Sequence, residues 1–140
     1  MRKSRLATET PAKPGEWFDG RVRRLELAPK ADGRGTLLPI EFDTLPFQPR
    51  RIFTIANVPA GCSRGGHGHL VGDQILTCVN GAVRVTVRFK GDEHRIDLSP
   101  RTEALLIEAG VWARQDYLAD DSVLLVLSNV NYADVRYFEK

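Results

Sequence analysis

The stretch QILTCVNGAVRVTVRF, residues 74–89, decides the fold class of this chain. Within it, residues 83–89 alternate valine or phenylalanine with arginine or threonine, the period of two that puts one face of a β-strand into a core and the other toward water. Residues 75–79 form a largely apolar run that is followed by Asn80-Gly81. This dipeptide tolerates the positive φ angles of a type I′ turn and so predicts a hairpin. We expect two short strands here and a β-rich domain around them.

The rest of the chain repeats this pattern of short β-type runs between turn signals. Lys90-Gly91 predicts a further hairpin, and residues 123–127 are apolar on both faces, as is typical of a strand buried between two layers. No segment shows a sustained helical period, so the spacing of the runs predicts an all-β sandwich or barrel. The predicted strands are Val22–Leu27, Gly35–Phe42, Arg51–Val58, Gln74–Val79, Ala82–Phe89, His94–Leu98, Ala104–Ile107, Trp112–Leu118 and Ser122–Leu127.

The composition is that of an ordinary folded domain. The chain has 140 residues, 42% of them hydrophobic and 27% charged, which excludes collagen-like and low-complexity chains and leaves room for one core. A net charge of +2 is too small for a protein whose main partner is nucleic acid. No apolar run approaches the ~18–20 residues that cross a bilayer, so we expect no membrane partner and a cytoplasmic protein.

Two features concern the organisation of the chain. The proline-punctuated segment Thr10–Gly15 predicts an extended N-terminal arm over residues 1–20, followed by a single β-barrel domain over residues 21–140. Cys62 and Cys78 form no CxxC pattern, and a chain that can build its own core needs no disulfide framework. We therefore expect both thiols to be reduced.

The pair His67-Gly-His69 carries the strongest chemical signal in the sequence. On a strand, residues i and i+2 point to the same face, so the two imidazoles would project side by side into one space. Two structural histidines could also stand at this spacing. We favour a functional pair, because histidine is the side chain best able to exchange protons near neutral pH.

The residues around this pair follow the first sequence motif of the cupins: Gly61, five residues, His67-x-His69, three residues, and then Asp73 where a glutamate is usual. The second cupin motif ends in a third histidine, and that position falls on Ala113 here. Two histidines and one carboxylate can still bind non-haem iron or a similar metal. A metal site formed by His67, His69 and Asp73 is therefore one alternative.

Further motifs occur in a fixed order from about Arg21 to the C-terminus. They are Asp32–Leu37, Pro46-Phe47, Arg51–Ile55, Arg64–His69, Asp73-Gln74, Asn80-Gly81, Val111-Trp112, Val126–Ser128, Tyr132 and Asp134. In this order and spacing, the chain resembles the sugar-nucleotide 3,4-ketoisomerases of the WxcM-like cupin family. That family acts on thymidine-diphosphate (dTDP) 4-keto-6-deoxyglucose.

This resemblance implies a small jelly-roll cupin, a double-stranded β-helix that is usually a homodimer. It implies that a dTDP-sugar is held in the mouth of the barrel and that no metal or other cofactor is needed. The family's catalytic pair corresponds to His67 and His69, and its nucleotide-binding arginines to Arg34, Arg51 and Arg64. The implied reaction moves the keto group between C4 and C3 of a 4-keto-6-deoxyhexose, a step in deoxysugar biosynthesis for lipopolysaccharide or other glycosylated products.

The chemistry of this isomerisation suits an imidazole pair. The adjacent carbonyl acidifies the C3 proton, and a neutral imidazole with a pKa near ~6.5 can remove it and return a proton to C4 of the enediol. We assign His67 as the base at C3 and His69 as its proton-relaying partner. The enediolate needs hydrogen-bond donors, which Arg64, Gln74 or a protonated His69 could supply. Trp112 could stack on the thymine or form a wall of the sugar pocket.

The sequence departs from the family pattern at three places. Phe53-Thr54 stands where a tyrosine is frequent, Leu70 where a basic residue commonly follows the second histidine, and Ala113 where several members have histidine. These departures keep a third interpretation open beside the isomerase and the metal enzyme, namely a cupin that binds a sugar nucleotide without turnover.

Overall fold

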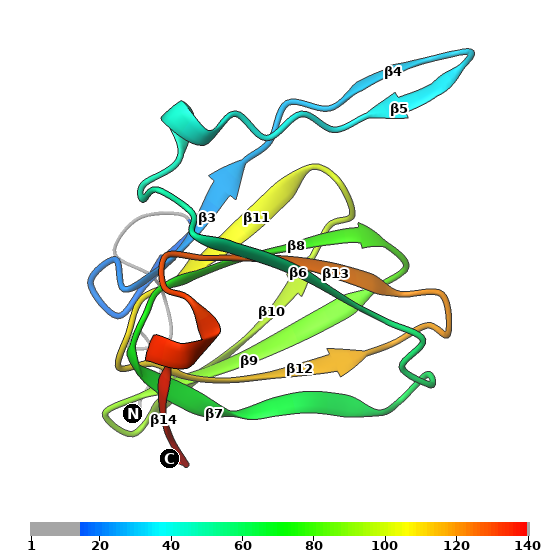
Figure 1. Cartoon of the computed structure of the whole chain (residues 1–140). Coiled ribbons are helices and arrows are strands. Elements are labelled where there is room, and N and C mark those ends of the chain that lie inside the picture. The colour runs from blue at the N-terminus through cyan, green and yellow to red at the C-terminus, as the bar shows by residue number, and fades with distance from the viewer. Residues whose placement is uncertain (1–14, 140) are drawn as a thin grey trace.

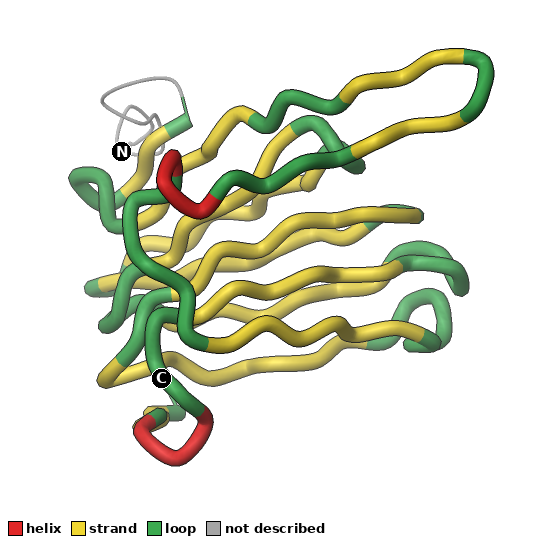
Figure 2. Tube along the Cα trace, turned by 45° about the horizontal axis from the view of Figure 1, so that its top comes forward, coloured by secondary structure: helices red, strands yellow, loops and turns green. Residues whose placement is uncertain are grey.

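The chain folds into two antiparallel β-sheets that pack face to face (Figures 1 and 2), in a computed structural model that describes residues 15–139. The five-stranded sheet contains, in spatial order, β10 (Asp92–Leu98), β9 (Val83–Phe89), β12 (Trp112–Tyr117), β7 (Ser63–Val71) and β14 (Arg136–Phe138). The six-stranded sheet contains, in spatial order, β2 (Glu16–Trp17), β3 (Val22–Glu26), β11 (Glu103–Ile107), β8 (Gln74–Asn80), β13 (Val123–Ser128) and β6 (Arg51–Ala56).

The remaining elements are few. A two-stranded hairpin, β4 (Lys30–Asp32) and β5 (Gly35–Leu37), reaches out beyond the sheets (Figure 2). Residues 15–139 contain no α-helix, only the 3-10 helices η2 (Phe42–Thr44) and η3 (Tyr132–Asp134). This arrangement confirms the predicted all-β class and its jelly-roll architecture. In the part of the chain that the structure describes, no helix is long and apolar enough to cross a membrane.

The two predicted hairpins have different outcomes. Lys90-Gly91 joins β9 directly to β10, and both turn residues have positive φ angles, 50° and 87°, so this hairpin is confirmed. The prediction of a hairpin at Asn80-Gly81 is wrong. Strand β8 pairs with β11 and β13, whereas β9 pairs with β10 and β12, so the chain passes from one sheet to the other at this point.

Contacts from a distant part of the sequence explain this corner. Asn80 Nδ2 donates to the Asp121 carbonyl oxygen at 2.9 Å, and Ala82 N donates to Ser122 Oγ at 3.1 Å. Gly81 lies so close to Ser122 that a Cβ atom added to it would be 2.6 Å from the Ser122 Cα. The dipeptide is compatible with a tight turn, but contacts 40 positions away decide which sheet the next strand joins.

Strand β13 is apolar on both faces because it contributes to two clusters, as its sequence predicts. Leu124 and Val126 pack into the main core between the sheets, where residues 83–87 supply three valines with at most 1% exposure. Leu127 belongs to a smaller cluster on the outer face of the six-stranded sheet, which the segment over residues 40–47 helps to cover. The strand is therefore buried from both sides.

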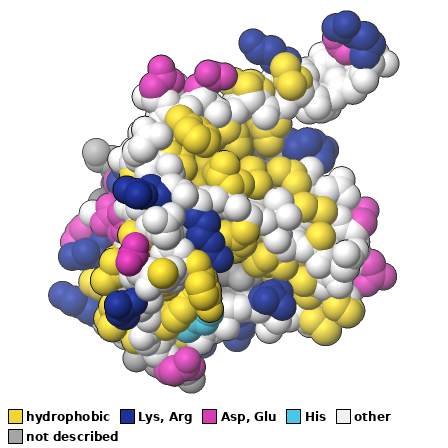
Figure 3. Space-filling model, viewed as in Figure 1, with side chains coloured by type: hydrophobic (Ala, Val, Ile, Leu, Met, Phe, Trp, Pro, Cys, Tyr) yellow, Lys and Arg dark blue, Asp and Glu magenta, His cyan; other side chains and the backbone are white. Residues whose placement is uncertain are grey.

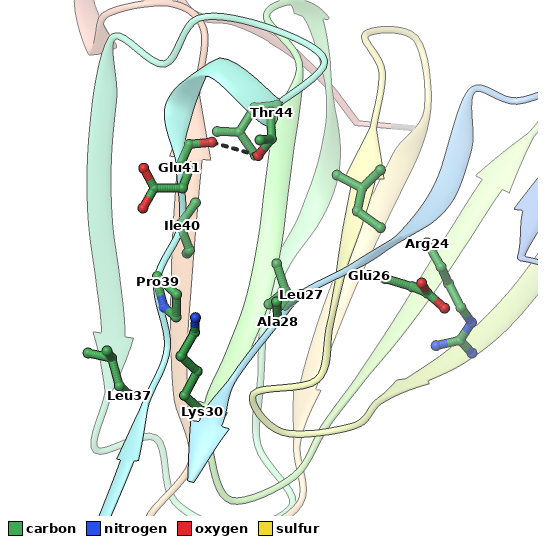
Figure 4. A pocket seen from close by; sticks show the side chains of 12 residues that line it. Arg24, Glu26, Leu27, Ala28, Lys30, Leu37, Pro39, Ile40, Glu41 and Thr44 are labelled. Atoms are coloured by element: carbon green, nitrogen blue, oxygen red, sulfur yellow. Dashed lines mark hydrogen bonds between the residues drawn. The ribbon is translucent and has the colours of Figure 1, made fainter.

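The segment predicted as one strand over Gly35–Phe42 is divided in the structure. Only the first three of these residues, Gly35–Leu37, form a strand, and among the described strands it pairs with β4 alone. The chain then runs over the six-stranded sheet and forms η2. Between this segment and β3 lies an open hollow of about 790 Å³ (Figure 4), with apolar side chains gathered at the surface around it (Figure 3). Its lining includes Leu25, Leu27, Leu37, Ile40 and Leu45.

The N-terminal prediction is only partly covered by the structure. Residues 1–14 lie outside the described residues, so the extended arm stays a prediction for them. Glu16–Trp17 form β2 and pair with β3, so pairing begins before residue 21. Cys62 is exposed and Cys78 is buried, and the two are not joined in a disulfide.

The close contact at Gly81 leads to a prediction for stability. Gly81 (φ 76°) and Gly91 (φ 87°) both adopt the left-handed conformation, but nothing lies within 4 Å of a Cβ atom at Gly91. Gly91→Ala should therefore cost backbone strain alone, about 1–2 kcal/mol. Gly81→Ala should cost roughly 1–3 kcal/mol more, because its methyl group collides with the backbone of Ser122. Urea unfolding of both variants measures the difference, and equal losses would contradict this account.

Candidate active site

Strand β7 carries both histidines on its inner face. His67 lies opposite Ala113 of β12, and His69 lies opposite Tyr137 of β14. The centroids of the two imidazole rings are 5.7 Å apart and their planes are tilted by 32°. The period of two therefore places the rings side by side between the sheets, as the spacing of the motif predicts.

The two rings line a cavity of about 180 Å³. Its walls come from both sheets, with β6, β8 and β13 on one side and β7, β12 and β14 on the other. A smaller hollow of about 30 Å³ adjoins it and shares both histidines. The structure thus brings together most of the residues that the sequence nominates, namely His67, His69, Arg51, Arg64 and Gln74.

Arg34 lies outside this cavity. It lies in the turn of the β4-β5 hairpin, its side chain is 92% exposed, and its Nη2 atom is 2.8 Å from Asp32 Oδ2. The hydrogen bonds from Arg34 to the carboxylate lower the pKa of Asp32. In this chain, then, the guanidinium pairs within its own hairpin, on an arm that points away from the barrel (Figure 1).

Trp112 also lies apart from the histidines. Its neighbour Ala113 faces them, so the alternation along β12 turns Trp112 to the outer face of the five-stranded sheet. There it is buried, with the guanidinium carbon of Arg88 4.2 Å from its ring centroid, and it lines a separate hollow with Phe138. Tyr117, a second aromatic on this strand, is fully buried in the main core.

The environment of His69 holds that imidazole in its neutral form. Burial, which is the largest cause, and the electrostatic effect of the nearby His67 and Arg51 together lower the pKa of His69 from 6.5 to about 4. At neutral pH, His69 therefore has one donor and one acceptor nitrogen. The expectation that a protonated His69 donates to the enediolate does not fit this resting state. The Arg51 guanidinium carbon is 4.4 Å from the Phe53 ring centroid and 5.0 Å from that of Tyr132.

The carboxylate of Asp73 holds two loops together. Oδ1 accepts a hydrogen bond from Ala109 N at 2.7 Å, and Oδ2 accepts one from Asn129 Nδ2 at 3.1 Å. Asp73 N in turn donates to Asn129 Oδ1 at 2.8 Å. Among residues 15–139, no three His, Cys, Asp or Glu side chains are grouped as a metal site requires. The alternative that joins Asp73 to His67 and His69 therefore finds no geometric support.

The sequence does not single out two polar residues of the cavity, Gln115 of β12 and Tyr137 of β14. Gln115 shares its inward face with Ala113, so the alternation along that strand could have indicated it. Tyr137 belongs to a three-residue strand, which is too short to show a period. Only the pairing of β14 with β7 brings Tyr137 to the histidines, and that pairing has no local signal.

A cavity between two antiparallel sheets, lined by a histidine pair and two arginines, defines this molecule as a small cupin with a site for a small polar ligand. Comparison with protein families agrees with this classification. The family model described as "FdtA: WxcM-like, C-terminal" matches residues 20–140. The chain therefore belongs to the WxcM-like, C-terminal (FdtA) family.

Several relatives are enzymes of sugar-nucleotide metabolism. The TDP-4-oxo-6-deoxy-alpha-D-glucose-3,4-oxoisomerase of Aneurinibacillus thermoaerophilus is 29% identical over 110 residues, which are 78% of this chain and 79% of the relative. The 3,4-ketoisomerase QdtA of Thermoanaerobacterium thermosaccharolyticum, solved as a mutant with TDP-4-keto-6-deoxyglucose, has a TM-score of 0.80 at 30% identity, covering 86% of this chain and 88% of that one. A 3,4-ketoisomerase from Helicobacter canadensis has a TM-score of 0.78 at 25% identity, with coverage of 85% and 90%.

The neutral state of His69 leads to a prediction for stability against pH. Between about pH 6.5 and pH 4, the unfolded chain binds a proton at this position that the folded chain does not, so lowering the pH through this range should destabilise the fold. His69→Gln should lose that part of the pH dependence, and His94→Gln should retain it. Urea unfolding at several pH values tests this. Parallel curves for the wild type and His69→Gln would contradict it.

Proposed function

We propose that this protein is a sugar-nucleotide 3,4-ketoisomerase that moves the keto group of a dTDP-4-keto-6-deoxyhexose between C4 and C3. The observation that carries the proposal is the pair His67 and His69, side by side in a cavity that Arg51 and Arg64 also line. The similarity to an oxoisomerase of TDP-4-oxo-6-deoxyglucose, and to QdtA, supports this substrate class.

In the proposed mechanism, the two histidines divide the proton transfers. His67 takes the proton from C3, the electrons of that bond form a C3=C4 double bond, and the C4 carbonyl oxygen becomes an oxyanion. Neutral His69 donates its ring proton to this oxygen and accepts the proton of the C3 hydroxyl at its other nitrogen. As the C3 carbonyl forms, protonated His67 returns a proton to C4. Both imidazoles end uncharged, His69 as its other tautomer, so no oxidant or reductant is needed.

The negative charge of the enediolate needs donors fixed in place before it develops. Arg64 of β7 and Gln74 of β8 line the same cavity as the histidines, from opposite sheets. Because both lie on strands, their positions are set by the sheets, and little reorganisation is required as the charge forms. We assign to Arg64 and Gln74 the role of hydrogen-bond donors to the enediolate, because His69 is not protonated at neutral pH.

Arg51 is our candidate for the diphosphate. Its guanidinium packs against Phe53 and Tyr132, which fixes its plane at the cavity wall and leaves its donors for phosphate oxygens. Phe53 brings no hydroxyl to the site. This is the specific feature that favours the second candidate, a cupin that binds the sugar nucleotide without turnover.

We further propose that the protein acts in the cytoplasm, in the biosynthesis of deoxysugars for lipopolysaccharide or other glycosylated products, and that it is a homodimer. The β4-β5 hairpin supports the dimer, because within residues 15–139 its strands pair only with each other, and 64% of Leu37 is exposed. Among the strands that the structure describes, β6 ends the six-stranded sheet with one side unpaired. We propose that the hairpin of one copy joins the sheet edge of the other, which would direct Arg34 toward the partner rather than to its own cavity.

The isomerase proposal is tested with dTDP-4-keto-6-deoxyglucose in deuterated water, followed by NMR. We expect the wild type to form a 3-keto product and to introduce solvent deuterium at C3 or C4. His67→Asn should lose both activities while its affinity for TDP stays within about threefold, because it removes a proton carrier and leaves the arginines in place. His94→Asn is the matched control and should remain active.

Two outcomes would count against the proposal. Full turnover by His67→Asn would remove this residue from the mechanism. TDP binding by the wild type without any deuterium incorporation would favour the binding protein instead.

The dimer proposal is tested by the mass of the protein in solution, measured by light scattering. Leu37→Asp places a charge on the exposed apolar side chain of the hairpin and should shift the protein toward monomer. Leu118→Asp is the matched control, a leucine 43% exposed outside the hairpin, and it should leave the dimer intact. A monomeric wild type, or a dimeric Leu37→Asp variant, would contradict the proposed interface.

A further inference from the structure

We propose that Tyr137 is a positioning residue whose ring fixes the orientation of the His67 and His69 imidazoles, and that the contact between Phe138 and Gly68 holds it in place. The role in turnover rests on the proposed function of the two histidines as proton carriers. The positioning itself is a statement about packing and has its own test.

The contacts of Tyr137 join both histidines. Its ring centroid is 4.4 Å from that of His67, with the planes at 75°, and 5.1 Å from that of His69, with the planes at 63°. Both are edge-to-face arrangements, the geometry that aromatic pairs prefer. The two histidine rings are farther from each other, at 5.7 Å, than either is from Tyr137. Tyr137 is therefore the common neighbour that sets the angle of each ring.

The glycine between the histidines explains how Tyr137 is held. A Cβ atom added to Gly68 would lie 2.1 Å from Cζ of Phe138, so the Phe138 ring occupies the space above this glycine. Successive residues of a strand point to opposite faces of the sheet. Because the Phe138 side chain packs on the outer face, the Tyr137 side chain points to the inner face. The His-Gly-His motif thus supplies both the reacting rings and the gap that anchors β14.

Tyr137 differs from a tyrosine that serves the core. Its side chain lies at the edge of the sheet and 45% of it is exposed, whereas Tyr117 is fully buried. A half-exposed ring contributes less apolar burial to stability, so the fold should survive its replacement. Its position instead closes one side of the space around the imidazoles.

The orientation of the rings matters for the proposed reaction. Proton transfer requires a ring nitrogen within hydrogen-bond reach of the sugar atom, and small misplacements are costly in rate. The ring of Tyr137 also contributes to the burial that lowers the pKa of His69. The other ionisable groups around His69 are His67 and Arg64 on β7, Arg51 on β6 and Glu108 before β12.

The experiment compares Tyr137→Phe with Tyr137→Leu by NMR titration of the histidine ring protons and by steady-state kinetics. Tyr137→Phe keeps the ring and should match the wild type in both. Tyr137→Leu should raise the pKa of His69 from about 4 toward 6.5, and should lower kcat by about tenfold or more with a smaller change in KM. Gly68→Ala is the second variant, since it displaces Phe138, and it should act in the same direction.

The outcomes separate this proposal from the isomerase proposal. If Tyr137→Leu and Gly68→Ala both keep the wild-type His69 titration, Tyr137 does not position the pair and the proposal is overturned. If Tyr137→Phe loses as much kcat as Tyr137→Leu, the hydroxyl acts chemically and positioning by the ring is overturned. If the wild type has no isomerase activity, the proposed function fails, and the titrations still decide the positioning role.

Discussion

The period of two along strand β7 is the constraint on which the site depends. His67 and His69 share the inner face of the strand, and the glycine between them opens the outer face to the ring of Phe138. One strand therefore presents both imidazoles on its inner face and receives the ring of Phe138 on its outer face. A slip of one residue in its register against β12 would reverse both faces at once, so the pairing of β7 with β12 fixes the chemistry as much as the histidines do.

The electrostatics of the cavity follow from the same packing. The sheets bury His69 beside Arg51, and together these effects favour an uncharged imidazole. The Arg51 guanidinium keeps its positive charge, which is available to an anionic ligand. The site thus combines a His69 imidazole that is uncharged at neutral pH with arginine cations at its walls, which suits a keto sugar attached to a diphosphate.

Much of the fold and part of the site could be predicted from the sequence. The alternation in residues 83–89 and the double-sided run at 123–127 identified strands of the two sheets, because both patterns are local. The histidine pair and the cavity arginines followed from strand geometry and from the family resemblance. The prediction of a hairpin at Asn80-Gly81 was wrong, because contacts with Asp121 and Ser122 decide the path of the chain there.

Two further residues show that local sequence does not determine which side chains reach the cavity. Trp112 is one position away from the inward-facing Ala113, and the strand register, which no motif encodes, turns it outward. Tyr137 reaches the histidines only because a three-residue strand pairs with β7. Composition and spacing identify which residues can do chemistry, and long-range pairing decides which of them meet.

The place of β14 in the chain also affects how the protein acquires its active form. Residues 136–138 close one wall around the histidines, yet they pair with a strand that precedes them by more than half the length of the described chain. The pairings of β6 with β13 and of β3 with β11 close loops at least as long, so separation alone does not set β14 apart. What sets it apart is that it is an edge strand of only three residues, whose few contacts make its pairing one of the least stable in the sheets. A folding intermediate that contains both sheets but lacks this last strand would hold the two imidazoles in contact with bulk water, so competence for catalysis should arrive later than the bulk of the β-structure.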